Sequence, residues 1–265
     1  MILTSKFVLL NYPKTGSTFA RKMLRRVDDR AIPRQKWGHW TPGKRERLKR
    51  WFTRLTVRIG VSAPVEVFVP RLWQPDRRID QHGTVSQIPW EFRNLPVVSI
   101  VRNPLDRIVS QYHFRWYTKY PAAPVDTIRA RLPSFPDLSF DEYLIYVREF
   151  KRAEYIDHRS MNTPDVGFET ISFIRMFFTQ PDVVLEQMDT EFIQSGAFKT
   201  FLPDQLHLLQ TETLNEDLAD VLAGMGYPRE AVDAIHENKK IQPGPGTRRK
   251  ENDTWRSHYT PRQYD

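Results

Sequence analysis

The chain has 265 residues, of which 40% are hydrophobic and 27% charged, a composition that supports a buried core and excludes a wholly disordered protein. Lysine and arginine number 40 against 32 aspartates and glutamates. The resulting net charge of +8 favours anionic partners such as nucleic acid, a lipid surface, or phosphorylated or sulfated small molecules. The absence of cysteine excludes disulfides, thiolate catalysis and cysteine-ligated zinc.

No apolar run approaches the ~20 residues that a membrane span needs. The run SKFVLL near the N-terminus lacks a small-residue cleavage site, so we interpret it as the first strand of the fold rather than a secretory signal. We therefore expect a soluble, cytoplasmic protein. Nothing in the sequence resembles an interdomain linker, and we expect one domain over residues 1–265.

The first elements in the chain are a strand, a helix and a basic segment. Residues 6–12 are nearly all apolar, as in a strand buried on both faces, and helical spacing follows from Ser17 to Val27. Residues 42–59 form a basic amphipathic pattern whose apolar positions are Leu48, Trp51, Phe52, Leu55 and Ile59. We expect this apolar face to pack on the core. Lining an acceptor cleft and lying on anionic lipid are the alternatives.

Two further strands are predicted at 65–70 and 97–101, and a turn and helix follow the second one. From about residue 139 helices dominate, beginning with a capping box of Ser139 and Glu142. Helical patterns recur near 168–178, 214–224 and 228–238, and QPGPG at 242–246 ends them. This order predicts an α/β fold with a central parallel sheet flanked by helices and a helix-rich C-terminal half.

The segment NYPKTGST, residues 11–18, lies between the first strand and the first helix. Gly16 permits a tight turn, and the amides of residues 15–19 would point outward at a helix N-terminus, where an anion is favoured. Lys14 adds a positive charge, and Ser17 and Thr18 add hydroxyl donors. An ordinary strand-to-helix turn with hydroxyl caps would use the same residues.

A second anion-binding motif is predicted where the strand 97–101 ends. Arg102 follows this strand directly, and Ser110 lies about two turns into the next helix. Both could face the crevice outside the strand ends, where parallel α/β sheets bind ligands. The alternatives are a surface salt bridge of Arg102 with Asp106 and a Ser110 hydroxyl bonded to its own backbone.

With these two motifs, the sequence resembles the sulfotransferase family. YPKTGST is similar to the family's 5′-phosphosulfate loop, and VVSIVRNPLDRIVSQY to its 3′-phosphate motif. LQTETLNEDLADVLAGMGYP and WRSHYTP resemble late segments of many members. The resemblance implies a P-loop-like α/β fold, 3′-phosphoadenosine 5′-phosphosulfate (PAPS) as sulfuryl donor, a hydroxylated acceptor, and no need for a metal.

Carried over to this chain, the resemblance makes Lys14 the residue that contacts the phosphosulfate bridge. It places the 5′-phosphate on Thr15, Gly16, Ser17, Thr18 and Phe19, and the 3′-phosphate on Arg102 and Ser110. In the segment GTRRKENDTW, Arg248, Arg249 or Lys250 would also reach the 3′-phosphate from a loop over the nucleotide; a flexible basic tail explains these residues equally well.

The base that accepts the acceptor's proton is predicted to be His82. It lies in DQHGTVSQIP, ahead of the strand 97–101, where many sulfotransferases carry a catalytic histidine, and imidazole titrates near neutrality. The flanking lysine and proline of the family's cytosolic branch are missing here. Because glycan-modifying branches often use a glutamate, Glu66 and Glu91 are alternatives. We interpret His39, His113 and His207 as structural or acceptor-pocket residues.

Fewer residues of the sequence bear on the identity of the acceptor. The aromatic-rich stretch HFRWYTKY at 113–120 suits the faces of sugars, so we expect a glycan or glycolipid hydroxyl. Contact with a membrane surface is left open. A P-loop kinase-like phosphotransferase would need Gly-Lys-Ser/Thr and an acidic magnesium ligand, whereas Lys14 precedes its glycine. A nucleic-acid-binding protein would fit the charge, but no recognisable module is present, and we expect no nucleic-acid partner.

Overall fold

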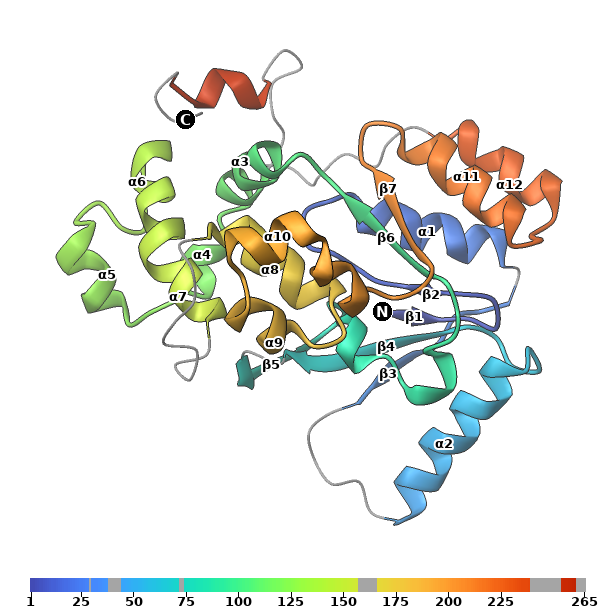
Figure 1. The fold of residues 1–265 in the computed structure, drawn as a ribbon. Helices are drawn as coiled ribbons and strands as arrows, with labels where there is room; N and C mark the ends of the chain where they lie inside the picture. Colours follow the sequence, from blue (N-terminus) through green and yellow to red (C-terminus); the bar gives the residue numbers. More distant parts are fainter. Residues whose placement is uncertain (29, 38–43, 72–73, 157–165, 239–253, 261–265) are drawn as a thin grey trace. The chain divides into compact units, whose positions relative to one another are not determined.

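A computed structural model describes residues 1–28, 30–37, 44–71, 74–156, 166–238 and 254–260 (Figure 1). The chain divides into two compact units, one built from Met1–Val101 and Ile174–Ile241, the other from Arg102–Phe173 and Gln242–Asp265. Each unit combines two separate stretches of chain, and the single domain over 1–265 stays a prediction. Within the described ranges, no helix has the length and apolarity needed to cross a bilayer.

The first unit contains a seven-stranded sheet in the order β3-β4-β1-β2-β6-β7, with β5 paired to β4. β2 runs parallel to β6, β6 to β7 and β3 to β4, whereas β1 and β5 pair antiparallel with their neighbours. The strands are β1 (Ile2–Leu3), β2 (Val8–Leu9), β3 (Arg34–Lys36), β4 (Val65–Arg71), β5 (Gln74–Asp80), β6 (Val97–Val101) and β7 (Leu206–Gln210).

The α/β class is confirmed, but the sheet is mixed where a parallel one was expected. Short connections join β1 to β2 and β4 to β5, and connections this short can only join antiparallel strands. The predicted strands at 65–70 and 97–101 are observed as β4 and β6. β7 was not predicted; of its five residues, LHLLQ, only Leu209 is buried.

The main core of the first unit lies between the sheet and three helices: α1 (Ser17–Val27), α11 (Leu214–Gly224) and α12 (Arg229–His236). Phe19, Met23 and Leu24 of α1 pack there against Val98 and Ile100 of β6. These strand residues are two apart and so share one face of the sheet. The predicted helices at 17–27, 214–224 and 228–238 are therefore confirmed, and this packing anchors the first turn of α1 beside the end of β6.

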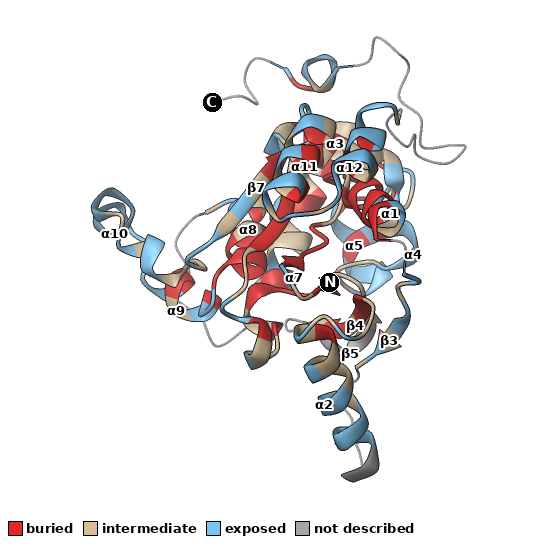
Figure 2. Ribbon diagram, turned by 90° about the vertical axis from the view of Figure 1, so that its right-hand side faces the viewer, coloured by how far each residue is buried: buried red, intermediate tan, exposed pale blue. Residues whose placement is uncertain are grey.

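Further helices of the first unit connect the strands. Helix α2 (Lys44–Arg58) follows β3, and η1 (Val85–Gln87) and η2 (Trp90–Phe92) precede β6. Figure 2 shows α2 mostly in the colours of exposed and intermediate residues. The segment before β7 contains α9 (Pro181–Glu186), α10 (Thr190–Ser195) and η4 (Ala197–Phe201). Helix α8 (Phe168–Phe177) begins in the second unit and ends in the first.

The second unit is helical and rich in packed aromatic rings. Its elements are α3 (Pro104–Phe114), α4 (Trp116–Lys119), α5 (Val125–Arg131), α6 (Phe140–Tyr146), a π-helical turn η3 (Val147–Lys151), α7 (Arg152–Tyr155) and η5 (Trp255–His258). The predicted capping box is confirmed: Glu142 N donates to Ser139 Oγ, and Ser139 N donates to the Glu142 carboxylate. Tyr117, Tyr143 and Tyr146 are buried and pack together: the rings of Tyr143 and Tyr146 stack, and that of Tyr117 is tilted against both.

Candidate functional site

The turn between β2 and α1 has two residues in the left-handed region, Lys14 with φ 66° and Gly16 with φ 93°. A lysine rarely adopts this conformation, so its backbone is held there by the surrounding structure. At Gly16 a Cβ atom would lie 3.0 Å from the Leu214 Cδ2. Glycine therefore suits position 16 mainly through its backbone freedom, and α11 approaches it closely.

The first turn of α1 is suited to an anion. Among the described residues, no side chain caps the helix at Gly16, and the first turn holds no acidic residue. Its amide groups and the positive end of the helix dipole consequently favour a negative ligand. Ser17 is buried and Thr18 is exposed, while Thr15 Oγ1 donates to the Tyr12 carbonyl oxygen at 2.8 Å and stiffens the turn.

Thr211, which the sequence analysis missed, ties this turn to the end of β6. Its Oγ1 lies 2.8 Å from the carbonyl oxygen of Thr15 and 2.8 Å from that of Val101. Its amide also donates to Val101 O at 3.0 Å, which extends the β6–β7 ladder by one bond. One hydroxyl thus sets the spacing between the loop and the residue before Arg102. No local signal could have found it, because Thr15 lies 196 positions away.

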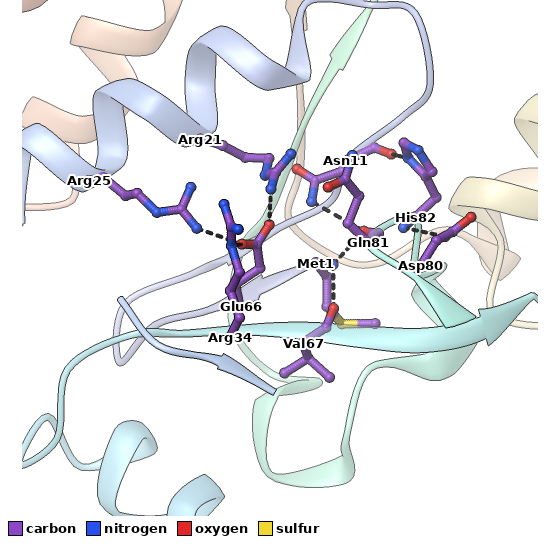
Figure 3. Close-up of polar contacts among 10 residues, drawn as sticks. All are labelled: Met1, Asn11, Arg21, Arg25, Arg34, Glu66, Val67, Asp80, Gln81 and His82. Carbon is purple, nitrogen blue, oxygen red and sulfur yellow. Dashed lines mark hydrogen bonds and ion pairs between the residues drawn. The ribbon is translucent and has the colours of Figure 1, made fainter. Parts of the chain in front are cut away.

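His82 contacts the residue that leads into the loop (Figure 3). Its Nδ1 lies 2.5 Å from the Asn11 carbonyl oxygen, and its amide donates to Asp80 Oδ1 at 2.8 Å. A carbonyl can only accept, so Nδ1 carries the hydrogen and Nε2 carries the lone pair. Burial lowers the pKa of His82 to about 4, against an opposing influence from Asp80. The ring is therefore neutral at pH 7, with Nε2 as its proton acceptor.

Glu66 and Glu91, the alternative bases, both form ion pairs. Glu66 is fully buried in β4 and pairs with Arg21, Arg25 and Arg34, as Figure 3 shows. Burial alone would raise the pKa of Glu66, but these guanidinium groups outweigh it and the pKa is lowered. Glu91 pairs with Arg54 at 3.0 Å. The Glu66 carboxylate is therefore occupied by its ion pairs, whereas the neutral His82 ring keeps a lone pair on Nε2.

Arg102 and Ser110 belong to the second unit, where Arg102 directly follows β6. Asn103 caps α3 by accepting from Leu105 N at 3.0 Å and Asp106 N at 3.3 Å. Arg102 forms the ion pair with Asp106 that was weighed as an alternative. Ser110 lies one turn beyond Asp106 on the same helix face. Its hydroxyl has no hydrogen-bond partner among the described residues, and the alternative bond to its own backbone is not observed.

The described part of the closing segment, residues 255–260, contacts α3 within the second unit. Tyr259 is buried and its hydroxyl donates to Leu105 O at 3.1 Å. The ring of His113 packs edge-on against that of His258, while His207 is exposed in β7. His39, Arg248, Arg249 and Lys250 lie outside the described residues.

Two other features bear on the site. A hollow of about 440 Å³ lies between α2 and the β3–β4 edge, lined by residues that include Ile32, Phe52 and Val57 and by none of the predicted donor-site residues. In the part of the chain that the structure describes, no group of three or more histidine, aspartate or glutamate side chains could hold a metal ion. The expectation that no metal is needed stays a prediction.

Comparison with known proteins decides the family. A model described as the sulfotransferase domain matches residues 4–226, a range that includes the loop at 11–18, His82, Arg102 and Ser110. The chain belongs to the sulfotransferase family. The prediction of a PAPS-dependent sulfotransferase, and hence of an enzyme, is confirmed at the level of the family. Membership in this family argues against the kinase-like and nucleic-acid-binding alternatives.

The other comparisons add a distant structural likeness. A crystal structure of the mouse sulfotransferase SULT7A1 complexed with PAP is similar to this sulfotransferase with a TM-score of 0.46 and 12% identity. The alignment covers 98% of this chain and 80% of the mouse chain. A search of curated proteins found no match.

Proposed function

We propose that this sulfotransferase moves the sulfuryl group of PAPS to an acceptor hydroxyl by in-line displacement, with the loop Lys14–Phe19 holding the 5′-phosphosulfate. The observation that carries the proposal is the loop itself. Lys14 and Gly16 are held in the left-handed region ahead of a helix N-terminus that has no side-chain cap among the described residues. Such a turn presents amides and a cation to one anion.

The reaction is a displacement at sulfur. The acceptor oxygen forms a bond to sulfur while the bond from sulfur to the bridging oxygen breaks, leaving 3′-phosphoadenosine 5′-phosphate. Lys14 stabilises the negative charge that develops on the bridging oxygen. The acceptor's proton goes to His82 Nε2, because Nδ1 already donates to Asn11.

Arg102 and Ser110 are proposed to hold the 3′-phosphate. The support is their placement on one side of α3, with Asp106 between them and paired to Arg102. A bound phosphate would compete with Asp106 for the guanidinium and would accept from the Ser110 hydroxyl. Arg248 and Arg249 stay predictions for the same phosphate.

A glycan or glycolipid acceptor is supported by an aromatic cluster in the second unit. The rings of Phe114 and Trp116 stack with centroids 5.5 Å apart, and those of Trp116 and Tyr120 lie 4.6 Å apart. Phe114 and Tyr120 are exposed. Exposed aromatic faces of this kind suit the apolar faces of sugar rings.

Calorimetric titration of 3′-phosphoadenosine 5′-phosphate tests the donor site. We expect magnesium-independent binding that weakens by about 10- to 100-fold in Arg102→Ala, because a charged hydrogen-bonding group is lost. Lys14→Ala should weaken binding similarly. Lys22→Ala and Arg131→Ala, which remove exposed cations in each unit, serve as matched controls. Absence of binding by the wild type, or tighter magnesium-dependent binding of ATP, would contradict the proposal.

The role of His82 needs a separate measurement. His82→Gln should keep donor affinity and lower turnover by about 10²-fold or more, the usual contribution of a general base. Glu66→Ala and Glu91→Ala should keep turnover per folded molecule. Turnover retained in His82→Gln would exclude His82 as the base.

A further inference from the structure

The apolar stripe of α2 is exposed, contrary to the expectation that it packs on the core. Leu48 is 64% exposed, Phe52 61% and Ile59 63%, whereas Val57 is 1% exposed. Seven of the eleven exposed large hydrophobic residues in the described chain come from α2, the turn after it and η2: Leu48, Trp51, Phe52, Leu55, Ile59, Val61 and Trp90. Such clustering marks an interaction surface.

The helix is turned so that its more polar side contacts the body of the first unit. At helical spacing Val57 lies about 180° around the axis from Leu48. On one flank of the helix Arg54 pairs with Glu91 at 3.0 Å, and Arg58 Nε donates to Glu91 O at 3.0 Å. These contacts fix the rotation of α2 about its axis and leave the apolar stripe on the outside, where Figure 2 shows exposed residues along the helix.

Basic residues lie beside this stripe. The sequence of α2 contains seven lysines and arginines and one acid, Glu46, which pairs with Arg50 at 3.1 Å. Arg47 and Lys49 are exposed and fall on opposite sides of the stripe. An apolar stripe with aromatic residues and flanking cations matches a surface made of acyl chains below and anionic headgroups above.

We propose that α2 binds the surface of an anionic lipid membrane, with Leu48, Trp51, Phe52, Leu55 and Ile59 inserted between the headgroups. Arg47 and Lys49 contact the headgroup phosphates. A second copy of the chain fits less well, because a two-fold contact through this face would bring the same cations together. The inference does not depend on the proposed sulfuryl transfer.

Vesicle flotation with the full chain tests the proposal in the absence of nucleotide. We expect binding to phosphatidylcholine vesicles that contain about 30 mol% phosphatidylserine, and weak binding to phosphatidylcholine alone. Because the headgroup contacts are electrostatic, about 0.5 M NaCl should reduce binding. Equal or absent binding to both vesicles would overturn the proposal.

Two double variants separate the apolar and the charged contributions. Phe52→Glu with Leu55→Glu, and Arg47→Glu with Lys49→Glu, should each lower partitioning by at least about tenfold. The control is Ile193→Glu, which places one glutamate on an exposed apolar position of α10 and should bind like the wild type. Thermal unfolding followed by circular dichroism checks that each variant is folded. An equal loss of vesicle binding in Ile193→Glu would overturn the proposal. So would a wild-type protein that binds no vesicles and instead forms a dimer, if the Phe52/Leu55 double variant is the only one that dissociates it.

Discussion

Replacing Thr211 by valine should weaken donor binding although Thr211 need not touch the donor. The substitution keeps the shape of the side chain and removes the hydroxyl that lies 2.8 Å from both Thr15 O and Val101 O. Val101 O still accepts the Thr211 amide at 3.0 Å, so Thr15 O is the carbonyl that loses its partner. Leaving one partly buried carbonyl without a partner costs about 1–2 kcal/mol of unfolding free energy.

The same loss frees the loop from the end of β6. If the loop must recover its spacing when the donor binds, ~1.4 kcal/mol of that cost appears as about a tenfold weaker affinity. The assay pairs urea unfolding with calorimetric titration of 3′-phosphoadenosine 5′-phosphate. Thr211→Ser keeps the hydroxyl and should restore affinity even if the missing methyl lowers stability.

Thr213→Val is the matched control, since Thr213 Oγ1 donates at 2.9 Å to Asp217 on the exposed side of the same connection. We expect its donor affinity to equal that of the wild type. Nucleotide binding by Thr211→Val as tight as by Thr213→Val would refute this role of Thr211, and so would binding by Thr211→Ser as weak as by Thr211→Val.

Three further predictions concern stability. Gly16→Ala should lower the free energy of unfolding by about 1–2 kcal/mol, because alanine is strained at φ 93°. Measured by urea unfolding, Gly167→Ala should leave this free energy unchanged, because a Cβ atom at position 167 would meet open space. Equal losses in the two variants would contradict the prediction. Glu66→Gln should lower the free energy of unfolding by about 3 kcal/mol, because buried Arg21 loses its full counter-charge. Urea unfolding should show a much smaller change for Glu149→Gln, which removes one partner of an exposed ion pair. A wild-type urea midpoint in Glu66→Gln would contradict this prediction. The pKa of His82 is lowered from 6.5 in the unfolded chain to about 4 in the folded protein, so its contribution to the free energy of unfolding is present above pH 6.5 and is lost as the pH falls toward 4, by up to ~3 kcal/mol. The urea midpoints at pH 7 and pH 4.5 should therefore differ less in His82→Asn than in the wild type. An unchanged difference would count against the lowered pKa.

The apolar stripe of α2 shows that an amphipathic pattern can predict a helix without predicting which of its faces is buried. The spacing of Leu48, Phe52, Leu55 and Ile59 predicted the helix, and α2 is observed at Lys44–Arg58. Burial was expected because most such stripes face a core. Arg54 and Arg58, on one flank of the stripe, instead anchor the helix through Glu91, which lies in η2. Which side of a helix packs is set by partners distant in sequence.

The sequence by itself determined those parts of the site that are contiguous in the chain. A strand, the Lys14–Thr18 turn and α1 follow one another, and Arg102, Asn103 and α3 follow β6 directly, so residue type and spacing were enough to predict both motifs. Only the tertiary structure assigned Thr211 to the loop, Glu66 to three arginines, and the Nδ1 hydrogen of His82 to Asn11. These contacts join residues that lie 32 to 196 positions apart. Such pairings follow from strand order and helix packing, which local patterns do not specify.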